Sequence, residues 1–233
     1  MYSQRIGEQI RVTYTSVHPE EIEKALLANF DKNALLEKFK LPKDKFIVLA
    51  VGQFIDRKGR WTFLKAAETL AKTDADIAFV WLAPNLPGKK DQLLIDNLAL
   101  GDSFHLILSE TVGTNRQDIL RFFAISDVFA LPSFIEGLPI ALLEAMALKR
   151  PSISTNVYGI PEAVQHLETG LLIEPGDSKA LAEAILLLKN GPGLRKRLSE
   201  NGSRYVLKHF DDREAAKIAL AAYAECFSPA EPT

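Results

Sequence analysis

The sequence predicts an α/β protein built on a doubly wound parallel sheet. Two observations lead to this fold class. Short, continuous apolar runs such as residues 46–51 and 128–131 are typical of strands buried on both faces of a parallel sheet. These runs alternate with helix-like segments at the spacing of strand–helix–strand crossover units. With 233 residues and 47% hydrophobic content, the chain is long enough to bury the core of one large domain.

The individual elements follow from hydrophobic periodicity and from turn and cap residues. Strands are expected at residues 10–14, 46–51, 76–83, 104–108, 127–131, 151–155 and directly after Gly170. Helices are expected at residues 19–39, 60–72, 89–100, 115–125, 139–148, 178–189, 194–208 and 212–227.

Composition excludes several classes of function. A net charge of −2 gives no general attraction to nucleic acid, so no nucleic-acid partner is expected. The single cysteine, Cys226, cannot form an internal disulfide, which fits a reducing compartment. No apolar run approaches the length of a membrane span, and the amino end lacks a signal-peptide core. We therefore expect a cytoplasmic protein.

The stretch 131–147 is the part of the sequence most informative about function. A strand end, a loop containing Gly137 and a helix beginning near Pro139 would direct backbone N–H groups and the positive end of a helix into one crevice. That arrangement suits a phosphate or diphosphate. Because Glu136 and Glu144 would repel an anion, we expect them to accept hydrogen bonds from neutral hydroxyl groups. A diphosphate flanked by two hydroxyl-bearing sugars is the layout of a nucleotide sugar.

A second strand-to-helix turn carries a glycine and cations. Gly52 follows the expected strand at 46–51, and Arg57 and Lys58 directly precede Gly59. Such a turn is a second cradle for phosphate oxygens. A lysine alone would face solvent by default, but the position of Lys58 after a buried strand and beside a glycine favours a phosphate-binding role.

The spacing of the two glutamates resembles a known signature. Glu136, seven residues and Glu144, with Pro132-Ser133 before and Ala-Met-Ala after, resemble the motif of the retaining GT-B glycosyltransferases of family four. The resemblance covers roughly residues 10–227. It implies a Rossmann-like half of a GT-B architecture, namely the carboxyl-terminal, donor-binding half.

The resemblance also implies a domain organisation. Residues 1–40 would be a lead-in strand and linker helix, residues 41–210 the nucleotide-sugar-binding domain, and residues 211–233 a crossover helix and tail. An acceptor, whether glycan, lipid or small molecule, would be bound by an amino-terminal domain that lies outside this chain. That domain could also attach the protein to a membrane.

Each site residue receives a role from the same resemblance. Glu144 would bind the ribose hydroxyls of a nucleoside diphosphate sugar, and Glu136 would bind the sugar being transferred. Lys58, with Gln53 or Arg57, would offset the charge on the departing diphosphate, which makes Lys58 and Glu136 the expected catalytic residues. Other expected contacts are Gly52, Gly137, Leu138, Pro139 and Ile140 to the donor, and Ser109, Glu110 and Thr111 to the nucleobase.

The implied chemistry needs neither a metal nor another cofactor. A double displacement would require a carboxylate nucleophile under the anomeric carbon, and the sequence identifies none. The resemblance implies a front-face route, in which the leaving diphosphate helps to deprotonate the acceptor and Glu136 orients and stabilises.

Two positions depart from the family pattern: Gln53 replaces an arginine, and Tyr158 replaces a common glycine. Two alternatives therefore stay open, a sugar-nucleotide epimerase-like GT-B protein and a non-catalytic nucleotide-sugar-binding module. A metal site at Asp74 and Asp76 is disfavoured, because residues that precede a strand lie opposite the expected crevice. The histidines show no metal-ligand spacing.

Overall fold

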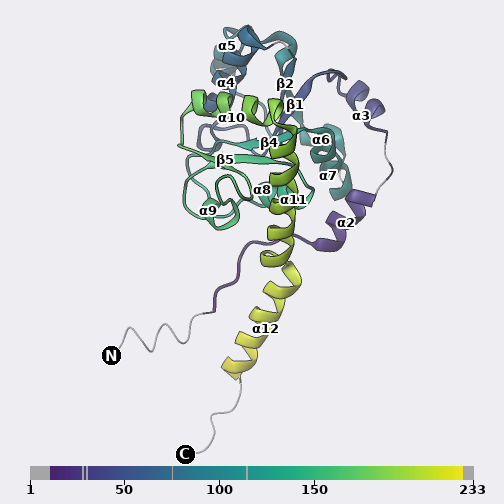
Figure 1. Cartoon of the computed structure of the whole chain (residues 1–233), viewed down its shortest axis with the longest axis vertical. Helices are drawn as coiled ribbons and strands as arrows, with labels where there is room; N and C mark the ends of the chain where they lie inside the picture. The colour runs from purple at the N-terminus through teal and green to yellow at the C-terminus, as the bar shows by residue number, and fades with distance from the viewer. Residues whose placement is uncertain (1–10, 28, 30, 75, 114, 228–233) are drawn as a thin grey trace, which may run out of the picture.

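The computed structural model describes residues 11–27, 29, 31–74, 76–113 and 115–227. Within them, six parallel strands form one sheet in the order β3-β2-β1-β4-β5-β6 (Figure 1). The strands are β1 (Phe46–Val51), β2 (Ile77–Ala83), β3 (Phe104–Leu108), β4 (Val128–Leu131), β5 (Ser152–Thr155) and β6 (Leu171–Ile173). This confirms the predicted fold class.

Helices cover both faces of the sheet. One face packs against α4 (Arg60–Thr73), α5 (Lys89–Asp96) and α10 (Ser178–Asn190). The other face packs against α7 (Arg116–Ile125), α8 (Ile140–Ala147) and α11 (Pro192–His209), with α2 (Pro19–Leu27), α3 (Lys32–Lys38) and α9 (Ile160–Ala163) at its margin. The remaining elements are η1 (Asp56–Lys58), η2 (Gly101–Ser103), α6 (Ser109–Val112) and α12 (Asp212–Phe227).

Side-chain alternation along the central strands explains why they are apolar throughout. In β1, Ile47 and Leu49 enter one hydrophobic core, whereas Val48 and Ala50 enter the other. Successive side chains of a strand point to opposite faces, so a strand covered on both sides needs apolar residues at every position. The two cores thus account for the continuous apolar runs in the sequence.

The strand order changes direction between β1 and β4, which pair directly. In sheets of this kind, ligands bind beyond the carboxyl ends of the strands at this switch point. The segments that follow β1 and β4 are residues 52–59 and 132–139, which are the two loops singled out in the sequence. The topology therefore places both candidate anion loops at the same edge of the sheet.

Several predicted elements were wrong in extent. Residues 11–16 form no strand, and Val17 makes only an isolated bridge to Asp211; residue 10 lies outside the described residues. The helix predicted at 19–39 is two helices, α2 and α3, of which α3 begins at a cap where Asp31 accepts from the N–H of Ala34. The periodicity continued across this break because both helices present apolar residues to one core.

Three smaller differences follow from local turn and cap geometry. The helix predicted to reach residue 100 ends at Asp96, and a turn with Ala99 in the left-handed region follows it. The loop at 109–113 contains the short helix α6. Helix α11 begins at Pro192, two residues earlier than predicted, because proline is tolerated in the first turn of a helix.

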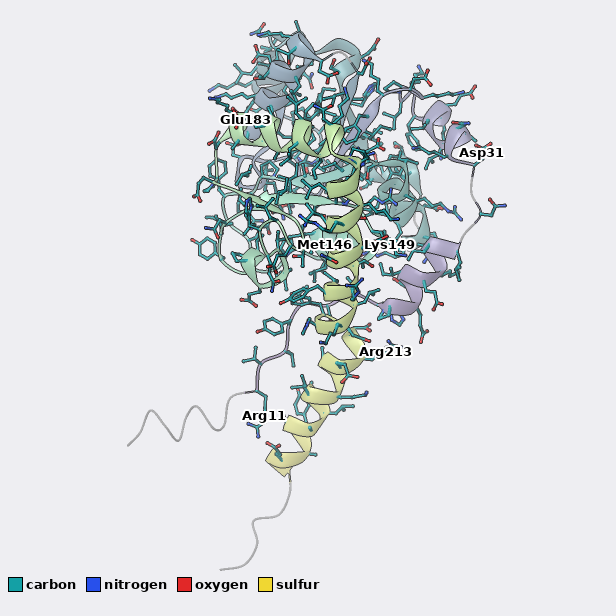
Figure 2. The ribbon with its side chains drawn as sticks, in the orientation of Figure 1. Arg11, Asp31, Met146, Lys149, Glu183 and Arg213 are labelled. Carbon is teal, nitrogen blue, oxygen red and sulfur yellow. The ribbon has the colours of Figure 1, made fainter. Side chains whose placement is uncertain are left out.

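The last helix, α12, extends away from the body of the domain (Figure 1). The segment from residue 11 runs beside it, and Arg11 forms an ion pair with Glu225 near the end of the helix (Figure 2). Ile218, Leu220 and Tyr223 of α12 are exposed. Within the described residues, the helix therefore carries apolar side chains that lie in solvent.

Candidate functional site

The loop after β1 is fixed by side chains from neighbouring elements. Trp81 donates from Nε1 to the carbonyl of Gly52 over 2.9 Å, and the amide oxygen of Asn85 accepts from the N–H of Phe54 over 3.0 Å. Gly52 itself has φ of 142°, a backbone conformation that side chains rarely adopt. These contacts define where the chain turns from the strand toward η1.

A buried arginine anchors the same loop from behind. Arg60 donates to Asp56 over 2.7 Å and to Asp91 of α5 over 2.8 Å, and its guanidinium lies against the rings of Phe54 and Trp61. Because a buried charge is stable only when paired, Arg60 ties η1 firmly to α4 and α5. The turn that carries Lys58 is thus a rigid element.

The two anion loops touch each other. The N–H of Phe134 donates to the carbonyl of Arg57 over 2.9 Å. Gly59 has φ of 77°, and a Cβ atom at this position would lie 1.8 Å from the carbonyl oxygen of Pro132. Only glycine permits this approach, so the loops at 52–59 and 132–139 are held as one unit.

Glu136 and Lys58 meet at this junction. The side chain of Glu136 is 7% exposed, and its Oε1 accepts both from Lys58 Nζ over 2.5 Å and from Ser133 Oγ over 2.8 Å. Among the described residues, no hydrogen bond reaches Oε2. One oxygen of the carboxylate is therefore fixed by the protein, while the other can accept a hydroxyl hydrogen bond from a ligand.

Glu144 is also buried, with a side chain that is 7% exposed, and it is paired with Arg116 at the first position of α7. The cation of this pair comes from the helix that follows the predicted nucleobase loop. Glu144 lies in α8, whereas Glu136 lies in the loop before it. Both glutamates therefore border the same edge of the sheet, each with a cation from a different element.

Backbone donors are available between the two glutamates. Helix α8 begins at Ile140 after an N-cap Pro139, one residue later than the helix start predicted from the sequence. Within the described residues, the N–H groups of Gly137, Leu138 and Ile140 donate no hydrogen bond. Unpaired N–H groups and a helix amino end favour an anion at this position.

The other predicted contacts divide into two groups. Ser109 and Glu110 line a cavity of about 520 Å³ together with Gly52 and Gly113. Thr111 is not among the residues that line it, and its hydroxyl donates to the carbonyl of Leu108 instead. The cavity borders the loop after β1 through Gly52.

Three further residues singled out in the sequence take no part in the ion pairs of Glu136 and Glu144. Gln53 and Arg57 are exposed, and no ion pair involves Arg57 within the described residues. Tyr158 is 72% exposed and has φ of 45°, in the left-handed region that favours glycine. Its ring points into solvent. The positive φ explains why a glycine would suit this position.

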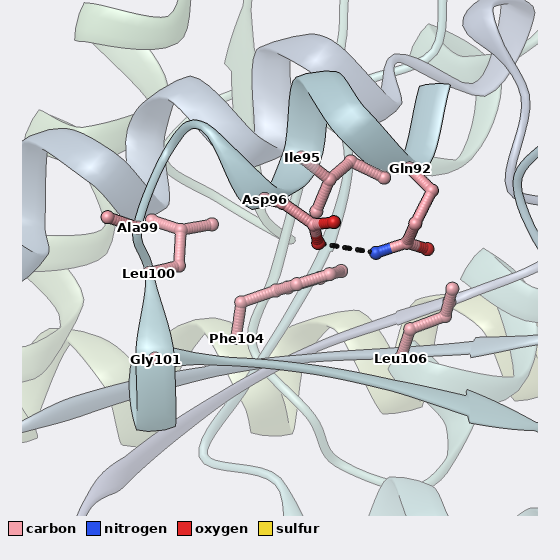
Figure 3. A pocket seen from close by; sticks show the side chains of 8 residues that line it. All are labelled: Gln92, Ile95, Asp96, Ala99, Leu100, Gly101, Phe104 and Leu106. Atoms are coloured by element: carbon pink, nitrogen blue, oxygen red, sulfur yellow. Dashed lines mark hydrogen bonds between the residues drawn. The ribbon is translucent and has the colours of Figure 1, made fainter. Parts of the chain in front are cut away.

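A second cavity lies elsewhere in the fold. It has a volume of about 380 Å³, lies between α5 and the edge strand β3, and is lined by Asp96, Phe104 and Leu106 among others (Figure 3). Gln92 donates to Asp96 across its rim. Because Phe104 begins β3, the cavity lies beside the amino-terminal half of this strand, whereas the two anion loops follow the carboxyl ends of β1 and β4.

Asp74 has a structural partner. Lys189 of α10 donates to both of its carboxylate oxygens, over 2.5 and 2.6 Å, and this hydrogen bonding lowers the pKa of the Asp74 carboxyl. Among the described residues, no group of three or more His, Cys, Asp or Glu side chains is arranged to hold a metal ion. Asp74 therefore joins two helices on one face of the sheet.

The family was identified by comparison with known proteins. The family model described as glycosyl transferases group 1 matches residues 31–205, more than half of the chain. The chain belongs to this family. The capsular polysaccharide biosynthesis glycosyltransferase CapM of Staphylococcus aureus is 30% identical over 184 residues, which cover 78% of this chain and 47% of that protein. The chain thus spans about half the length of the curated relatives it matches.

Solved structures of glycosyltransferases share the fold. A glycosyltransferase of Rickettsia africae has a TM-score of 0.82 at 23% identity, over 95% of this chain and 58% of that chain. HepE of Anabaena, solved in complex with UDP, has a TM-score of 0.76 at 19% identity, over 92% of this chain and 57% of that chain. The carboxyl-terminal domain of LpcC from Francisella tularensis, solved by itself, has a TM-score of 0.69 at 23% identity and is covered over 98% of its length by 84% of this chain.

Two residues of the site were not assigned a role from the sequence. Ser133 was noted only as part of a motif, and its hydrogen bond to Glu136 depends on the loop conformation. Arg116 carried no signal, because its partner Glu144 is 28 positions away (144 − 116) and the pairing depends on how α7 meets α8.

None of the helices in the described residues is long and apolar enough to cross a membrane.

Proposed function

We propose that this chain is the donor-binding half of a retaining glycosyltransferase that uses a nucleoside diphosphate sugar. The observation that carries the proposal is the convergence of Lys58, Glu136, Glu144 and unpaired N–H groups at the switch point of the sheet. The bound UDP in the Anabaena HepE structure supports a nucleotide ligand for this fold. The nucleobase would occupy the cavity lined by Ser109 and Glu110.

The roles of the two glutamates follow from their free hydrogen-bonding capacity. Glu136 would accept a hydroxyl of the transferred sugar at Oε2, because Oε1 is held by Lys58 and Ser133. Glu144 would accept the ribose hydroxyls. A hydrogen bond to an ionised carboxylate is about twice as strong as one between neutral groups, so both contacts would fix the donor firmly.

Charge on the leaving diphosphate would be offset by Lys58, by the exposed Arg57 or Gln53, and by the N–H groups of Gly137, Leu138 and Ile140. With these donors in place, we propose that no metal is required for donor binding. The transfer step would proceed with retention on one face of the sugar, with Glu136 stabilising the positive charge that develops at the anomeric carbon.

The other half of the enzyme would bind the acceptor. Since the chain spans about half the length of its relatives, and α12 exposes Ile218, Leu220 and Tyr223, we propose that an amino-terminal domain packs against α12. Burying these three side chains would remove apolar surface from water, which favours association.

The test is calorimetric titration of the chain with UDP, GDP and ADP without added metal. One nucleotide should bind, and Lys58→Ala should weaken it about 10- to 100-fold through loss of a charge-assisted contact. Glu144→Gln should weaken the ribonucleotide more than its 2′-deoxy form. Lys72→Ala, at an exposed ion pair on α4, is the matched control and should bind as the unchanged protein does.

Two outcomes would contradict the proposal. Binding of no nucleotide would argue against a donor site, and equal binding by Lys58→Ala and Lys72→Ala would remove Lys58 from it. In a protein that includes the acceptor domain, Glu136→Gln with full turnover would refute the role of Glu136. Epimerised donor formed without any acceptor would favour an epimerase, and binding without transfer or hydrolysis would favour a non-catalytic module.

A further inference from the structure

Both glutamates of the candidate site are paired with a cation before any ligand arrives. Lys58 pairs with Glu136, and Arg116 pairs with Glu144. The charges of these four side chains sum to zero. While both pairs stay closed, each of these two positive charges is already neutralised at contact distance, so attraction for a diphosphate comes from the unpaired N–H groups and from Arg57.

Arg116 is the more accessible of the two cations. Its side chain is 42% exposed, compared with 16% for Lys58. It is the first residue of α7, and Ile119, three positions later on the same helical face, lines the cavity of about 520 Å³ together with Gly52. Arg116 is not itself a lining residue, but it lies one helical turn from Ile119 and is paired with Glu144.

The pairing also limits access to Glu144. The side chain of Glu144 is only 7% exposed, and the guanidinium of Arg116 is in contact with its Oε1. Within the described residues no hydrogen bond reaches Oε2 of Glu144, so one oxygen is open to a ribose hydroxyl and the second becomes available only if the guanidinium moves. A guanidinium binds phosphate with the same forked geometry as it binds carboxylate, so a diphosphate beside the ribose is a suitable new partner.

We propose that Arg116 is a donor-binding residue that exchanges partners. It holds Glu144 in the empty site and moves to the diphosphate of the nucleotide when the ribose hydroxyls take its place. The exchange leaves every charge with a partner, because Glu144 gains hydroxyl donors and Arg116 gains phosphate oxygens. This inference rests on the proposed function, and it adds a specificity: the site favours nucleoside diphosphates over nucleosides through Arg116.

Comparing a nucleoside with its diphosphate distinguishes the two parts of the exchange, namely the release of Glu144 by Arg116 and the binding of Arg116 to the diphosphate. Both ligands must displace Arg116 from Oε1 of Glu144 if each ribose hydroxyl is to bind a carboxylate oxygen, but only the diphosphate offers Arg116 a new partner. Arg116→Gln removes both the ion pair with Glu144 and the charged contact to the diphosphate, while keeping a side chain that can form hydrogen bonds. Arg121→Gln is the matched control, because Arg121 lies on the same helix, is 40% exposed and pairs with Asp118.

The experiment titrates the chain with uridine and UDP, using NMR for the weaker ligand, and with the guanosine and adenosine pairs if UDP does not bind. The ratio of the nucleoside to the diphosphate dissociation constant should fall about tenfold in Arg116→Gln. UDP should bind more weakly and uridine at least as tightly. Arg121→Gln should leave the ratio unchanged, and Arg116→Lys, which keeps the charge but not the fork, should give a smaller fall.

Two results would overturn the inference. Equal changes in the affinities for uridine and UDP, which leave the ratio unchanged, would mean that Arg116 never reaches the diphosphate and that its ion pair is only structural. An equal fall of the ratio in Arg121→Gln would mean that any charge on α7 suffices. If Arg116→Gln does not fold, Arg116→Lys replaces it in the test. The inference is then overturned if Arg116→Lys binds both ligands tightly and leaves the ratio of the nucleoside to the diphosphate dissociation constant unchanged. Failure of the unchanged chain to bind any nucleotide would refute the proposed function itself, which is a separate outcome.

Discussion

Replacing Gly59 with alanine tests whether the two anion loops are held together by close backbone contact. A Cβ atom at Gly59 would lie 1.8 Å from the carbonyl oxygen and 2.6 Å from the carbonyl carbon of Pro132. Both atoms are backbone, so neither can rotate away as a side chain would. The loops must separate, and the hydrogen bond from Phe134 to Arg57 would be stretched or lost.

The expected cost can be worked out from three contributions. A left-handed conformation costs a non-glycine residue roughly 1–2 kcal/mol. Loss of the hydrogen bond between the loops costs about 0.5–1.5 kcal/mol. Overpacking that forces backbone shifts costs typically about 1–3 kcal/mol. Together these predict that Gly59→Ala lowers the free energy of unfolding by about 3–6 kcal/mol.

The measurement is equilibrium urea unfolding, with two glycines as controls. Gly101 also has positive φ, at 50°, but nothing lies within 4 Å of its added Cβ, so Gly101→Ala should cost only the conformational part, ~1–2 kcal/mol. Gly88 has neither constraint and Gly88→Ala should change stability by less than about 1 kcal/mol. If Gly59→Ala cost no more than Gly101→Ala, the loops would not be in rigid contact and this reasoning would be refuted.

Three further predictions concern the scaffold of the site. Asp177→Ala, which removes the N-cap of α10, should lower the free energy of unfolding by about 1 kcal/mol, as measured by the shift of the urea midpoint. Arg60→Leu leaves its acidic partners without their cation and should lower both the thermal midpoint and the affinity for nucleotide, whereas an unchanged affinity would contradict the anchoring of η1. Because Lys189 lowers the pKa of Asp74, the carboxylate adds stability above its ordinary value of 3.8, and this contribution is lost as the pH falls through the lowered value. Acid titration of unfolding should therefore show Asp74→Asn less stable than the unchanged protein near neutral pH, with the difference closing below about pH 4, and a difference constant with pH would exclude the linkage.

The sheet was predictable because its strands leave a simple pattern. A strand such as β1 that feeds two cores must be apolar at consecutive positions, and turns with glycine or proline mark its ends. The lead-in was not predictable in the same way. Residues 11–14 alternate as a strand would, yet the part of the chain that the structure describes offers them no neighbouring strand. The break between α2 and α3 leaves the apolar period almost intact.

Within the candidate site, sequence reasoning could select only residues that the local motif marks. Lys58 and Glu136 could be chosen because each follows a buried strand beside a glycine, although their contact with each other depends on the packing of the two loops. Ser133 and Arg116 act through partners placed by that packing. For Thr111, the contact to the nucleobase stays a prediction, and its hydroxyl donates to the carbonyl of Leu108 in this structure.

Donor binding and sugar transfer should be separable properties of this architecture. Every residue proposed to contact the donor lies on this chain, and the contacts that fix them, from Arg60 to η1 and from Ser133 to Glu136, are internal to it. The acceptor, by contrast, would be held by residues that the chain does not contain. Under the proposed function, a nucleotide should therefore bind to this chain with much of its specificity, including the preference proposed for Arg116. Transfer would additionally require exclusion of water and an aligned acceptor hydroxyl, which closure against an acceptor-binding domain would supply. Nucleotide affinity would then be the quantity on which substitutions in this chain act directly, and turnover would report on them only in a protein that includes that domain.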